Sequence, residues 1–396
     1  MKQGWTYKTL GEIATSMYRG SGIRRDQVTT DGIPCVRYGE IYTTYNISFS
    51  ECVSHTQESL IPNPKYFEHG DLLFAITGES VEDIGKTIAY MGKEKCMLGG
   101  DIICMKHNEN PKYLSYALST PDAIRQKGLG KTKLKVVHTN APSLQSIKIP
   151  LPSPAEQERI VERLDAAFAQ IEELKSNAER QLAEARALFQ SALTQAMQPK
   201  PGWQEIAFKD ICSFVRGPFG GSLKKECFKE SGYAVYEQQN AIYNKFSFRY
   251  FIDEEKYESM KRFSVNPGDL IMSCSGTIGK VAIIPDDAKQ GIINQALLKL
   301  TPSKKINKYY LKYLMESELF KELIRSYSDG AAIQNIASVS ILKEILLRIP
   351  SVSEQQRIVE YNDSLTASFY EIEDNYKQTA AECDALKQAL LRQIFE

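Results

Sequence analysis

Two long stretches of the sequence carry apolar residues at heptad spacing, and both begin with nearly the same words. Residues 153–165 read SPAEQERIVERLD, and residues 351–363 read SVSEQQRIVEYND. In each, a Ser at the N-cap and a Glu three residues later form a capping box, and the first copy adds a Pro at the first helical position. No Pro or Gly then interrupts either stretch up to Met197 or Phe395. The pattern predicts two helices of about 42 residues, each about 60 Å long.

A heptad stripe is narrow, so it favours one partner helix over a broad core. The nearest partner of each helix is the other copy. Because a globular segment lies between the two, we expect them to pair as an antiparallel coiled coil. The alternative is that each helix packs on its own domain. The residues expected to pair the helices, or to meet a partner, are Ile160, Leu164, Ile171, Leu174, Leu188, Ile358, Leu365, Phe369, Ile372, Leu386 and Leu390.

The repeat extends beyond the helices. Three further pairs share the displacement of 198 positions: Gly4-Trp5 with Gly202-Trp203, Leu10–Ile13 with Phe208–Ile211, and Gly70–Leu73 with Gly268–Ile271. Between these pairs the match is loose and needs gaps, and strand patterns mix with helical ones. We therefore predict an α+β fold: two tandem α+β domains, separated and followed by the long helices, with a pseudo-twofold internal repeat of period 198.

Charge alternates along the same segments. The turn-rich stretch 198–202 breaks the chain after the first helix. We expect a first domain at 1–150, a central helical spacer at 151–198, a second domain at 199–350 and a C-terminal helical spacer at 351–396. Their net charges are +3, −3, +5 and −5, although the whole chain sums to zero. Two mildly basic bodies therefore alternate with two acidic helices.

Composition excludes several classes of protein. The chain has 396 residues, 42% hydrophobic and 25% charged, as in an ordinary globular protein. No apolar run approaches the ~20 residues that cross a bilayer, and the first ten residues do not resemble a signal peptide. The eight cysteines include no CxxC and the four histidines no HxxxH. This disfavours a disulfide framework or a metal site and indicates reduced thiols and a cytoplasmic location.

The sequence contains no recognisable catalytic motif. Two GKT triplets, at 85–87 and 130–132, lack the first P-loop glycine, because Ser80 and Arg125 stand there. We find no GxGxxG after a strand, no GxSxG and no HExxH. We therefore expect no cofactor in this chain and no catalytic residues.

Both bodies instead interleave basic, amide and aromatic residues with glycines. Arg reads guanine and Asn or Gln reads adenine in the major groove, Glu can accept from cytosine, and other Lys and Arg residues bind phosphates. Any one of these residues is more often structural, but together they favour base reading over catalysis. The candidates for DNA contact are Arg19, Arg24, Arg25, Arg37, Tyr38, Glu40, Thr77, Lys131 and Lys133 in the first body, and Arg216, Lys224, Lys225, Glu237, Gln238, Gln239, Asn240, Ser275 and Thr277 in the second.

On these residues the whole chain resembles the specificity subunit of type I restriction–modification enzymes. The likeness rests on the GW…LGEI opening, the GDLL and IGK elements, and the IPLPSPAEQERIV junction with its long helix, each of which has a second copy. The second junction departs slightly, with Ser-Val-Ser where Pro-rich sequence is usual.

The resemblance implies a non-catalytic subunit whose two α+β domains are target recognition domains, each reading half of an asymmetric bipartite site on double-stranded DNA. The paired helices would set the spacer between half-sites and dock two modification (methyltransferase) subunits, which restriction subunits then join. S-adenosylmethionine, ATP and Mg would bind those partners in DNA methylation and restriction.

Elementary geometry favours the same reading. Two readers on one duplex need a separation matched to the groove repeat of ~34 Å per turn, and a paired helix is stiff enough to hold it. Because the two bodies differ in sequence, the half-sites should differ too. Two other functions stay open: a methyltransferase or nuclease with unrecognised motifs, which would act alone, and a coiled-coil adaptor, which would leave no sequence-dependent DNA footprint.

Overall fold

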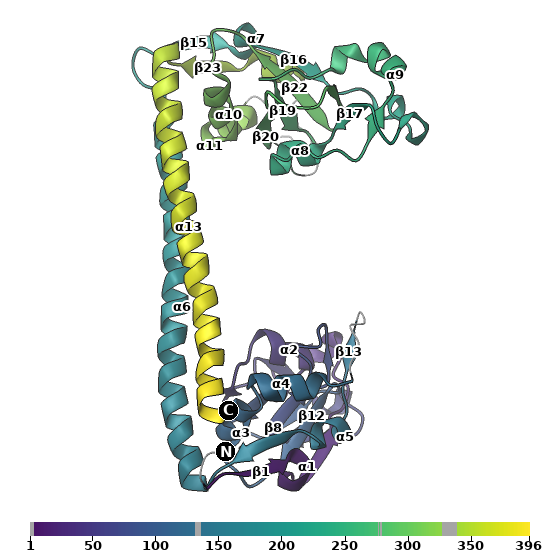
Figure 1. The fold of residues 1–396 in the computed structure, drawn as a ribbon, viewed down its shortest axis with the longest axis vertical. Helices are drawn as coiled ribbons and strands as arrows, with labels where there is room; N and C mark the ends of the chain where they lie inside the picture. The colour runs from purple at the N-terminus through teal and green to yellow at the C-terminus, as the bar shows by residue number, and fades with distance from the viewer. Residues whose placement is uncertain (1–3, 131–135, 276, 278, 327–338) are drawn as a thin grey trace. The chain divides into compact units, whose positions relative to one another are not determined.

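The computed structural model describes residues 4–130, 136–275, 277, 279–326 and 339–396 (Figure 1). Two units are formed: unit 1 is Met1–Arg180 with Tyr376–Glu396, and unit 2 is Gln181–Asn375. We call the α+β body of unit 1 (residues 4–151) head 1 and that of unit 2 (residues 202–349) head 2. The chain thus enters unit 1, passes through unit 2 and returns to unit 1.

Head 1 contains two five-stranded sheets, with strand orders β2-β12-β8-β10-β5 and β3-β6-β4-β11-β7, and the two-stranded pairs β1-β14 and β13-β9. Its elements in chain order are β1 (Thr6–Thr9), α1 (Leu10–Ile13), β2 (Ser16–Arg19), η1 (Arg25–Gln27), β3 (Val28–Thr29), β4 (Ile33–Val36), α2 (Tyr38–Thr43), β5 (Ser48–Phe49), β6 (Ser54–Thr56), η2 (Glu58–Leu60), β7 (Tyr66–Phe67), β8 (Leu72–Ala75), β9 (Thr77–Gly78), β10 (Thr87–Tyr90), β11 (Cys96–Leu98), β12 (Ile102–Lys106), α3 (Pro111–Ala117), α4 (Pro121–Gly128), β13 (Val137–His138), α5 (Ala141–Gln145) and β14 (Lys148–Leu151).

Head 2 repeats this plan with a four-stranded sheet, β16-β22-β19-β20, a three-stranded sheet, β18-β17-β21, and the pair β15-β23. Its elements are β15 (Gln204–Ala207), α7 (Phe208–Ile211), β16 (Cys212–Arg216), η3 (Gly220–Ser222), η4 (Lys225–Cys227), β17 (Tyr233–Tyr236), α8 (Gln238–Tyr243), β18 (Phe251–Ile252), α9 (Glu254–Ser259), η5 (Lys261–Phe263), β19 (Leu270–Ser273), β20 (Val281–Ile283), β21 (Gly291–Ile293), β22 (Leu297–Pro302), α10 (Lys308–Glu316), α11 (Glu318–Ser326), α12 (Val339–Glu344) and β23 (Leu346–Ile349). The predicted tandem α+β fold is confirmed, while the single period of 198 stays a prediction.

The central strand of head 1 divides its core. All four residues of β8 are fully buried. Successive side chains of a strand point to opposite faces, so Leu72 and Phe74 join one apolar cluster and Leu73 and Ala75 join another. In head 2 the corresponding strand, β19, divides two clusters in the same way. The GDLL and GDLI sequences therefore owe their apolar character to burial on both faces.

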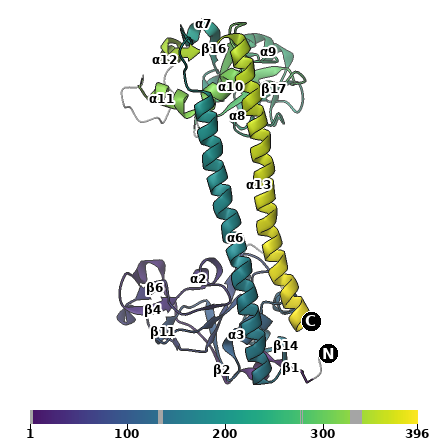
Figure 2. The same cartoon turned by 90° about the vertical axis from the view of Figure 1, so that its left-hand side faces the viewer.

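The predicted long helices are α6 (Pro154–Ala196) and α13 (Val352–Phe395). Within unit 1, Lys175 Nζ lies 2.7 Å from Asp384 Oδ2, and Glu172 forms an ion pair with Lys387. Residue numbers thus rise along α6 while they fall along α13, which makes the pair antiparallel. The two helices run side by side in both views (Figures 1 and 2).

Unit 2 contains its own antiparallel stretch of the same helices. The rings of Phe189 and Phe369 stack with centroids 4.4 Å apart, and Arg186 forms an ion pair with Glu373. Deeper in unit 2, the amide of buried Asn362 lies 3.8 Å from the sulfur of Met197, so the polar residue in the predicted apolar stripe packs against a thioether.

The heptad prediction is only partly right. Ile160, Leu164, Ile171 and Ile358 are buried, and Leu365, Phe369 and Leu390 are half-buried. Four others are between 42% and 72% exposed, so the helix pair leaves them largely uncovered, and the expectation that they meet a partner stays a prediction: Leu174, Leu188, Ile372 and Leu386. A single pair of helices buries only the side chains near the line of closest approach, and at this seam small residues, Ala178 and Cys383, occupy that line.

The first turns of each helix pack on the adjoining head rather than on the other helix alone. Ile160 and Leu164 join the core cluster of head 1, where Leu391 and Phe395 of α13 also lie. Ile358 joins the core cluster of head 2. The coiled-coil prediction and its alternative therefore each describe a different part of the helices.

A buried glutamine fixes each head to its long helix. In unit 1 the Gln157 carbonyl accepts from Asn110 N at 3.0 Å, and its amide donates to Pro152 O and to Glu109 Oε2 at 3.1 and 2.8 Å. Asn110 is itself the N-cap of α3. The Gln of the AEQ sequence thus closes the start of α3 against the start of α6.

Unit 2 uses the same contact. The Gln355 carbonyl accepts from Asn307 N at 2.7 Å, and its amide donates to Pro350 O at 2.9 Å and to Lys305 O at 3.3 Å. Both glutamines have no exposed surface. The repeated junction sequence is therefore explained by a buried hydrogen-bond network, which is costly to break.

Among the described residues, no helix combines the length and the apolar character that a membrane span requires.

Candidate nucleic-acid interface

In head 1, loops at one end of the main sheet are joined by backbone hydrogen bonds. Gly20 N donates to Ile102 O, Gly99 N to Val36 O and Ile76 N to Asp101 O, at 2.9–3.0 Å. A Cβ on Gly20 would collide with the Gly99 carbonyl, so only glycine allows this approach. We call the joined loops edge 1, which comprises residues 19–23, 37–40, 76–78 and 99–101.

Head 2 builds the same edge. Gly217 N donates to Leu297 O, Asn294 N to Tyr236 O and Cys274 N to Ala296 O, each at 2.9 Å. A Cβ on Gly217 would collide with the Asn294 carbonyl. Edge 2 comprises residues 216–219, 237–240, 274–275, 277 and 294–296. Most candidate residues of both heads lie on these two edges, so the structure brings them together.

Strand register shows which positions of the two edges correspond. Arg19 lies opposite Ile103 across β2 and β12, and Arg216 lies opposite Leu298 across β16 and β22. Val36 pairs with Leu98, as Tyr236 pairs with Ile293. Ala75 pairs with Ile102, as Ser273 pairs with Leu297. Counting from these pairs matches the following positions: Gly22 with Phe219, Arg37 with Glu237, Glu40 with Asn240, Thr77 with Ser275, Gly100 with Gln295, and Asp101 with Ala296.

The first arginine of each edge has a different environment. The Arg19 guanidinium donates to Gly100 O and to Asp101 Oδ1, the latter at 2.6 Å. At the position of Asp101, head 2 has Ala296, and no described carboxylate forms an ion pair with Arg216. Burial raises the pKa of the neighbouring Cys274 thiol to about 11, and the Arg216 guanidinium opposes that rise. Arg216 therefore keeps more capacity for an anionic ligand than Arg19.

The second charged position reverses its sign between the heads. Arg37 forms an ion pair with buried Glu40 at 2.8 Å. Its counterpart Glu237 accepts two hydrogen bonds from Arg249 at 2.9 and 3.0 Å. Edge 1 thus presents a cation where edge 2 presents a carboxylate braced by a cation from a neighbouring loop.

Glu40 and Asn240 have structural roles, contrary to the expectation that they contact bases. Glu40 accepts from Arg37 N at 3.0 Å and from Ser54 Oγ at 2.7 Å. Asn240 accepts from Glu237 N at 2.7 Å and donates to two carbonyls of the 245–247 loop. Both side chains are buried and their hydrogen-bonding groups are engaged. They fix the N-termini of α2 and α8 rather than face a ligand.

The other candidates of the edges are accessible to different degrees. Tyr38 is exposed at the start of α2, and Thr77 Oγ1 lies 3.1 Å from His138 Nδ1. The half-buried Gln238 donates its amide to Ser275 O, and Gln239 donates to Glu237 Oε2 at 3.3 Å. Thr277 is exposed.

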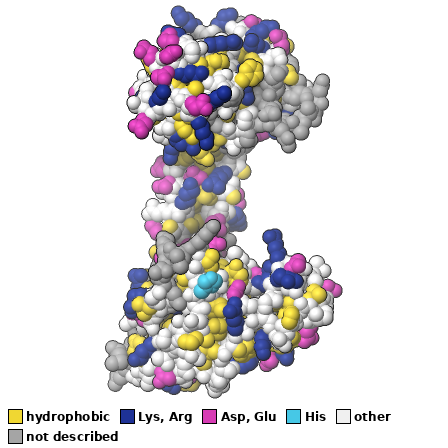
Figure 3. All heavy atoms as spheres, turned by 90° about the vertical axis from the view of Figure 1, so that its right-hand side faces the viewer, with side chains coloured by type: hydrophobic (Ala, Val, Ile, Leu, Met, Phe, Trp, Pro, Cys, Tyr) yellow, Lys and Arg dark blue, Asp and Glu magenta, His cyan; other side chains and the backbone are white. Residues whose placement is uncertain are grey.

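Four basic candidates lie apart from the edges and two lie outside the described residues. Arg24, Arg25, Lys224 and Lys225 are exposed at matching 3₁₀ turns, η1 and η4. Among the described residues, no side-chain contact joins them to edge 1 or edge 2. Lys131 and Lys133 lie outside the described residues. Lys and Arg side chains are spread over each head among acidic ones, without a single basic patch on the face drawn in Figure 3.

Three determinants of the edges escaped the sequence analysis. Asp101 and Arg249 restrain candidate residues from elsewhere in the chain, so no local motif reveals them. Phe219 lies three residues after the candidate Arg216 but is apolar, and is therefore not among the polar candidates. Its exposure could not be read from the sequence.

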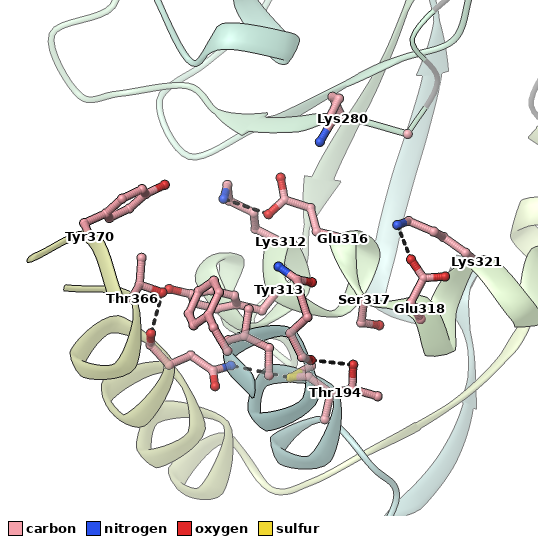
Figure 4. A pocket seen from close by; sticks show the side chains of 16 residues that line it. Thr194, Lys280, Lys312, Tyr313, Glu316, Ser317, Glu318, Lys321, Thr366 and Tyr370 are labelled. Carbon is pink, nitrogen blue, oxygen red and sulfur yellow. Dashed lines mark hydrogen bonds and ion pairs between the residues drawn. The ribbon is translucent and has the colours of Figure 1, made fainter. Parts of the chain in front are cut away.

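A groove of about 430 Å³ lies in unit 2 beside helices α6, α10 and α13. Its cations Lys312 and Lys321 are bound to Glu316 and Glu318, at 2.9 and 2.6 Å (Figure 4). Lys280 of the IGK element reaches toward it. Because two of its three cations are neutralised, the groove fits a phosphate backbone less well than edge 2 does.

Comparison with known proteins agrees with this architecture. The family model for the type I restriction modification DNA specificity domain matches residues 2–182 and again 200–381. The specificity subunit of the type I restriction enzyme EcoBI from Escherichia coli is 21% identical over 396 residues, covering 92% of this chain and 80% of that protein.

Two solved structures share the fold. A chain from a study of complex assembly and conformational transition in the type I R-M system superposes with a TM-score of 0.80 at 19% identity, covering 99% of this chain and 98% of that one. The HsdS subunit from Thermoanaerobacter tengcongensis gives a TM-score of 0.58 at 18% identity, covering 100% and 97%. The chain belongs to the type I restriction–modification DNA specificity family, with two copies of its domain.

Proposed function

We propose that this chain is the DNA sequence-specificity subunit of a type I restriction–modification complex and that each head reads one half of an asymmetric bipartite site. One observation carries this proposal: the same backbone edge is built twice, and its projecting side chains differ. An Arg-rich edge 1 and a mixed edge 2 would accept different base pairs, so the half-sites should differ.

In this proposal the edge residues read bases and the outlying cations bind phosphates. Arg37 and Gln239 are the strongest candidates for bidentate base contacts, because both lie at the N-terminus of an edge helix that buried Glu40 or Asn240 holds. Arg24, Arg25, Lys224 and Lys225 suit the phosphate backbone. The modest charges of the heads, +3 and +5 over 1–150 and 199–350, favour strong DNA binding only in complex with partners.

The long helices would set the spacer and dock two methyltransferase subunits. The exposed apolar residues of α6 and α13, which neither helix covers in this chain, support a protein partner there. These are Leu174, Leu188, Ile372 and Leu386.

The chain itself would be non-catalytic, and the partners would carry S-adenosylmethionine, ATP and Mg. We keep the domain boundaries 1–150, 151–198, 199–350 and 351–396, and a cytoplasmic location, as predictions. Restriction subunits would join the assembly through the methyltransferase subunits.

Methylation-aware sequencing of cells that carry this gene and its modification partner would test the proposal. We expect one bipartite motif with two unlike halves. Residues 14–145 are then exchanged for those of another family member. One half-site should change completely while the other is retained; a change in both would refute the assignment of one half-site to each head.

The spacer is tested separately. One heptad, about 7 residues, is inserted within 175–190 of α6, with a matching heptad in the facing part of α13. The spacer should lengthen while both half-sites stay the same. An unchanged spacer would mean that the helices do not measure it.

A further inference from the structure

Among the described residues, Phe219 is the most exposed large apolar side chain, at 92%. It stands at the tip of the loop that leaves β16, between Gly217 and the pair Gly220-Gly221. An apolar ring in water is unfavourable, and none of the described aromatic contacts includes it. Burial of the ring against a ligand would therefore lower the free energy of this position.

The root of this loop is fixed to edge 2. Gly217 N donates to Leu297 O at 2.9 Å, and Gly217 packs directly on the Asn294 carbonyl. Pro218 is buried, so the loop is held up to the residue before the ring. The glycines after it leave the far side free to adjust. Phe219 is thus presented from the same edge as Arg216 and Gln239.

The loop of head 1 that corresponds to the Phe219 loop has different packing. There, Ser21 bridges to Gly99, and Gly22 packs so closely on Gly100 that a Cβ on Gly100 would lie 2.8 Å from the Gly22 Cα. In head 2, Gln295 replaces Gly100 and Phe219 replaces Gly22. A side chain at the position of Gly100 leaves no room for an equally close approach, and Phe219 of head 2 is exposed.

We propose that Phe219 is an apolar wedge that enters a base-pair step beside the half-site read by head 2. This inference rests on the proposed function and adds that the ring of Phe219 is inserted between two base pairs. Proteins that bend DNA insert such side chains between base pairs and unstack them. Arg216, Lys224 and Lys225 lie on the same segment and can hold the flanking phosphates. Since head 1 has Gly22 there, only one half-site is wedged.

A wedge adds specificity without a hydrogen bond. Pyrimidine–purine steps unstack most easily, so head 2 should prefer a TA or CA step at the wedged position even though no side chain reads its base edges. Head 1 should show no such preference.

The test uses the complex with its modification subunits and duplexes carrying 2-aminopurine at successive positions of the identified site. The wild-type complex should raise the fluorescence at one step beside the second half-site. Phe219→Ala should abolish that signal and weaken binding about 5- to 100-fold, whereas Phe219→Tyr should retain most of both. Tyr309→Ala is the matched control, because this exposed aromatic lies on α10 next to the α13 junction.

Each other outcome is decisive. If Phe219→Ala keeps the signal and the affinity while Arg216→Ala weakens binding, the wedge is refuted and the proposed function stands. If Phe219→Ala instead loses the modification subunits, with unchanged DNA affinity in the complexes that do assemble, the ring contacts protein and the wedge is refuted. If the wild-type complex shows no sequence-dependent binding, the proposed function fails as well.

Discussion

The two heads share a backbone plan and differ in how they restrain charge at its edge. In head 1, Asp101 holds Arg19 and Glu40 holds Arg37, so both cations are positioned before any ligand arrives. In head 2, Arg216 has no such carboxylate among the described residues, and Glu237 replaces the second cation. Preorganised groups lose less entropy on binding. The comparison indicates that the same backbone arrangement can present different chemical groups to a ligand when only the side chains differ.

Substitution of the buried glutamines should have the largest effect on stability, and it tests whether the two units unfold independently. Gln157→Ala should destabilise unit 1, and Gln355→Ala unit 2, by about 3 kcal/mol each, because a buried N–H loses its acceptor. Hydrogen exchange of core amides in each unit measures this. Gln356→Ala removes an exposed neighbour that accepts one hydrogen bond from Asn307 Nδ2, and should cost less than about 1 kcal/mol because water can replace that contact. Equal losses in both units after either substitution would show that they unfold as one block.

A buried lysine distinguishes head 1 from head 2. Lys127 Nζ donates to Thr87 Oγ1 and Leu118 O, at 3.0 and 2.7 Å, and forms no ion pair within the described residues; burial lowers its pKa to about 7. Counted from the N-caps Thr120 and Ser317, head 2 has Ile324 at this position.

The sign of the resulting pH dependence follows from proton binding. Between pH 7 and about 10.4 the unfolded chain binds more protons at this site, so the stability of unit 1 should rise with pH across that range. Lys127→Met should therefore stabilise unit 1 by about 2 kcal/mol at or below pH 7. The gain should shrink toward pH 10. Denaturation monitored in unit 1 from pH 6 to 10 measures it. Ile324→Met should show no such trend, and a constant gain for Lys127→Met would contradict the assignment.

Adding the carboxylate of edge 1 to edge 2, or removing it from edge 1, should have the smallest effect, which is on DNA binding. Ala296→Asp would restrain Arg216 and weaken DNA binding by the complex about 3- to 10-fold, and the salt slope should fall by about 1 if Arg216 binds phosphate. Asp101→Ala should release Arg19 and raise the slope. Titration at several salt concentrations measures both. Glu258→Ala changes the charge of an exposed pair away from the edges and should alter neither; the same slope for all variants would mean that these arginines do not meet phosphates.

The sequence predicts the helices and strands well, because the patterns that mark them are local in the chain. Ser153, Pro154 and Glu156 mark the start of α6, and the helix begins at Pro154. The absence of internal Pro and Gly predicts the unbroken length of both helices. The buried strands were likewise visible as short apolar runs after Gly-Asp.

The sequence predicts the candidate interface less well, because contacts with residues distant in the sequence determine which side chains are available to a ligand. Asn240 has the right chemistry for adenine, but its amide is used by its own loop. Leu188 has the right spacing for a heptad, but the seam passes beside it. Which side chains are left over for a ligand depends on the three-dimensional packing, and local patterns do not contain it.

The return of the chain to unit 1 has a consequence for synthesis on the ribosome. The core of head 1 includes Leu391, Ile394 and Phe395, which are translated more than 200 residues after the rest of that core. At about 5–20 residues per second, head 1 waits tens of seconds with part of its apolar surface uncovered. During that interval a chaperone, or an early-binding subunit, has its best opportunity to act.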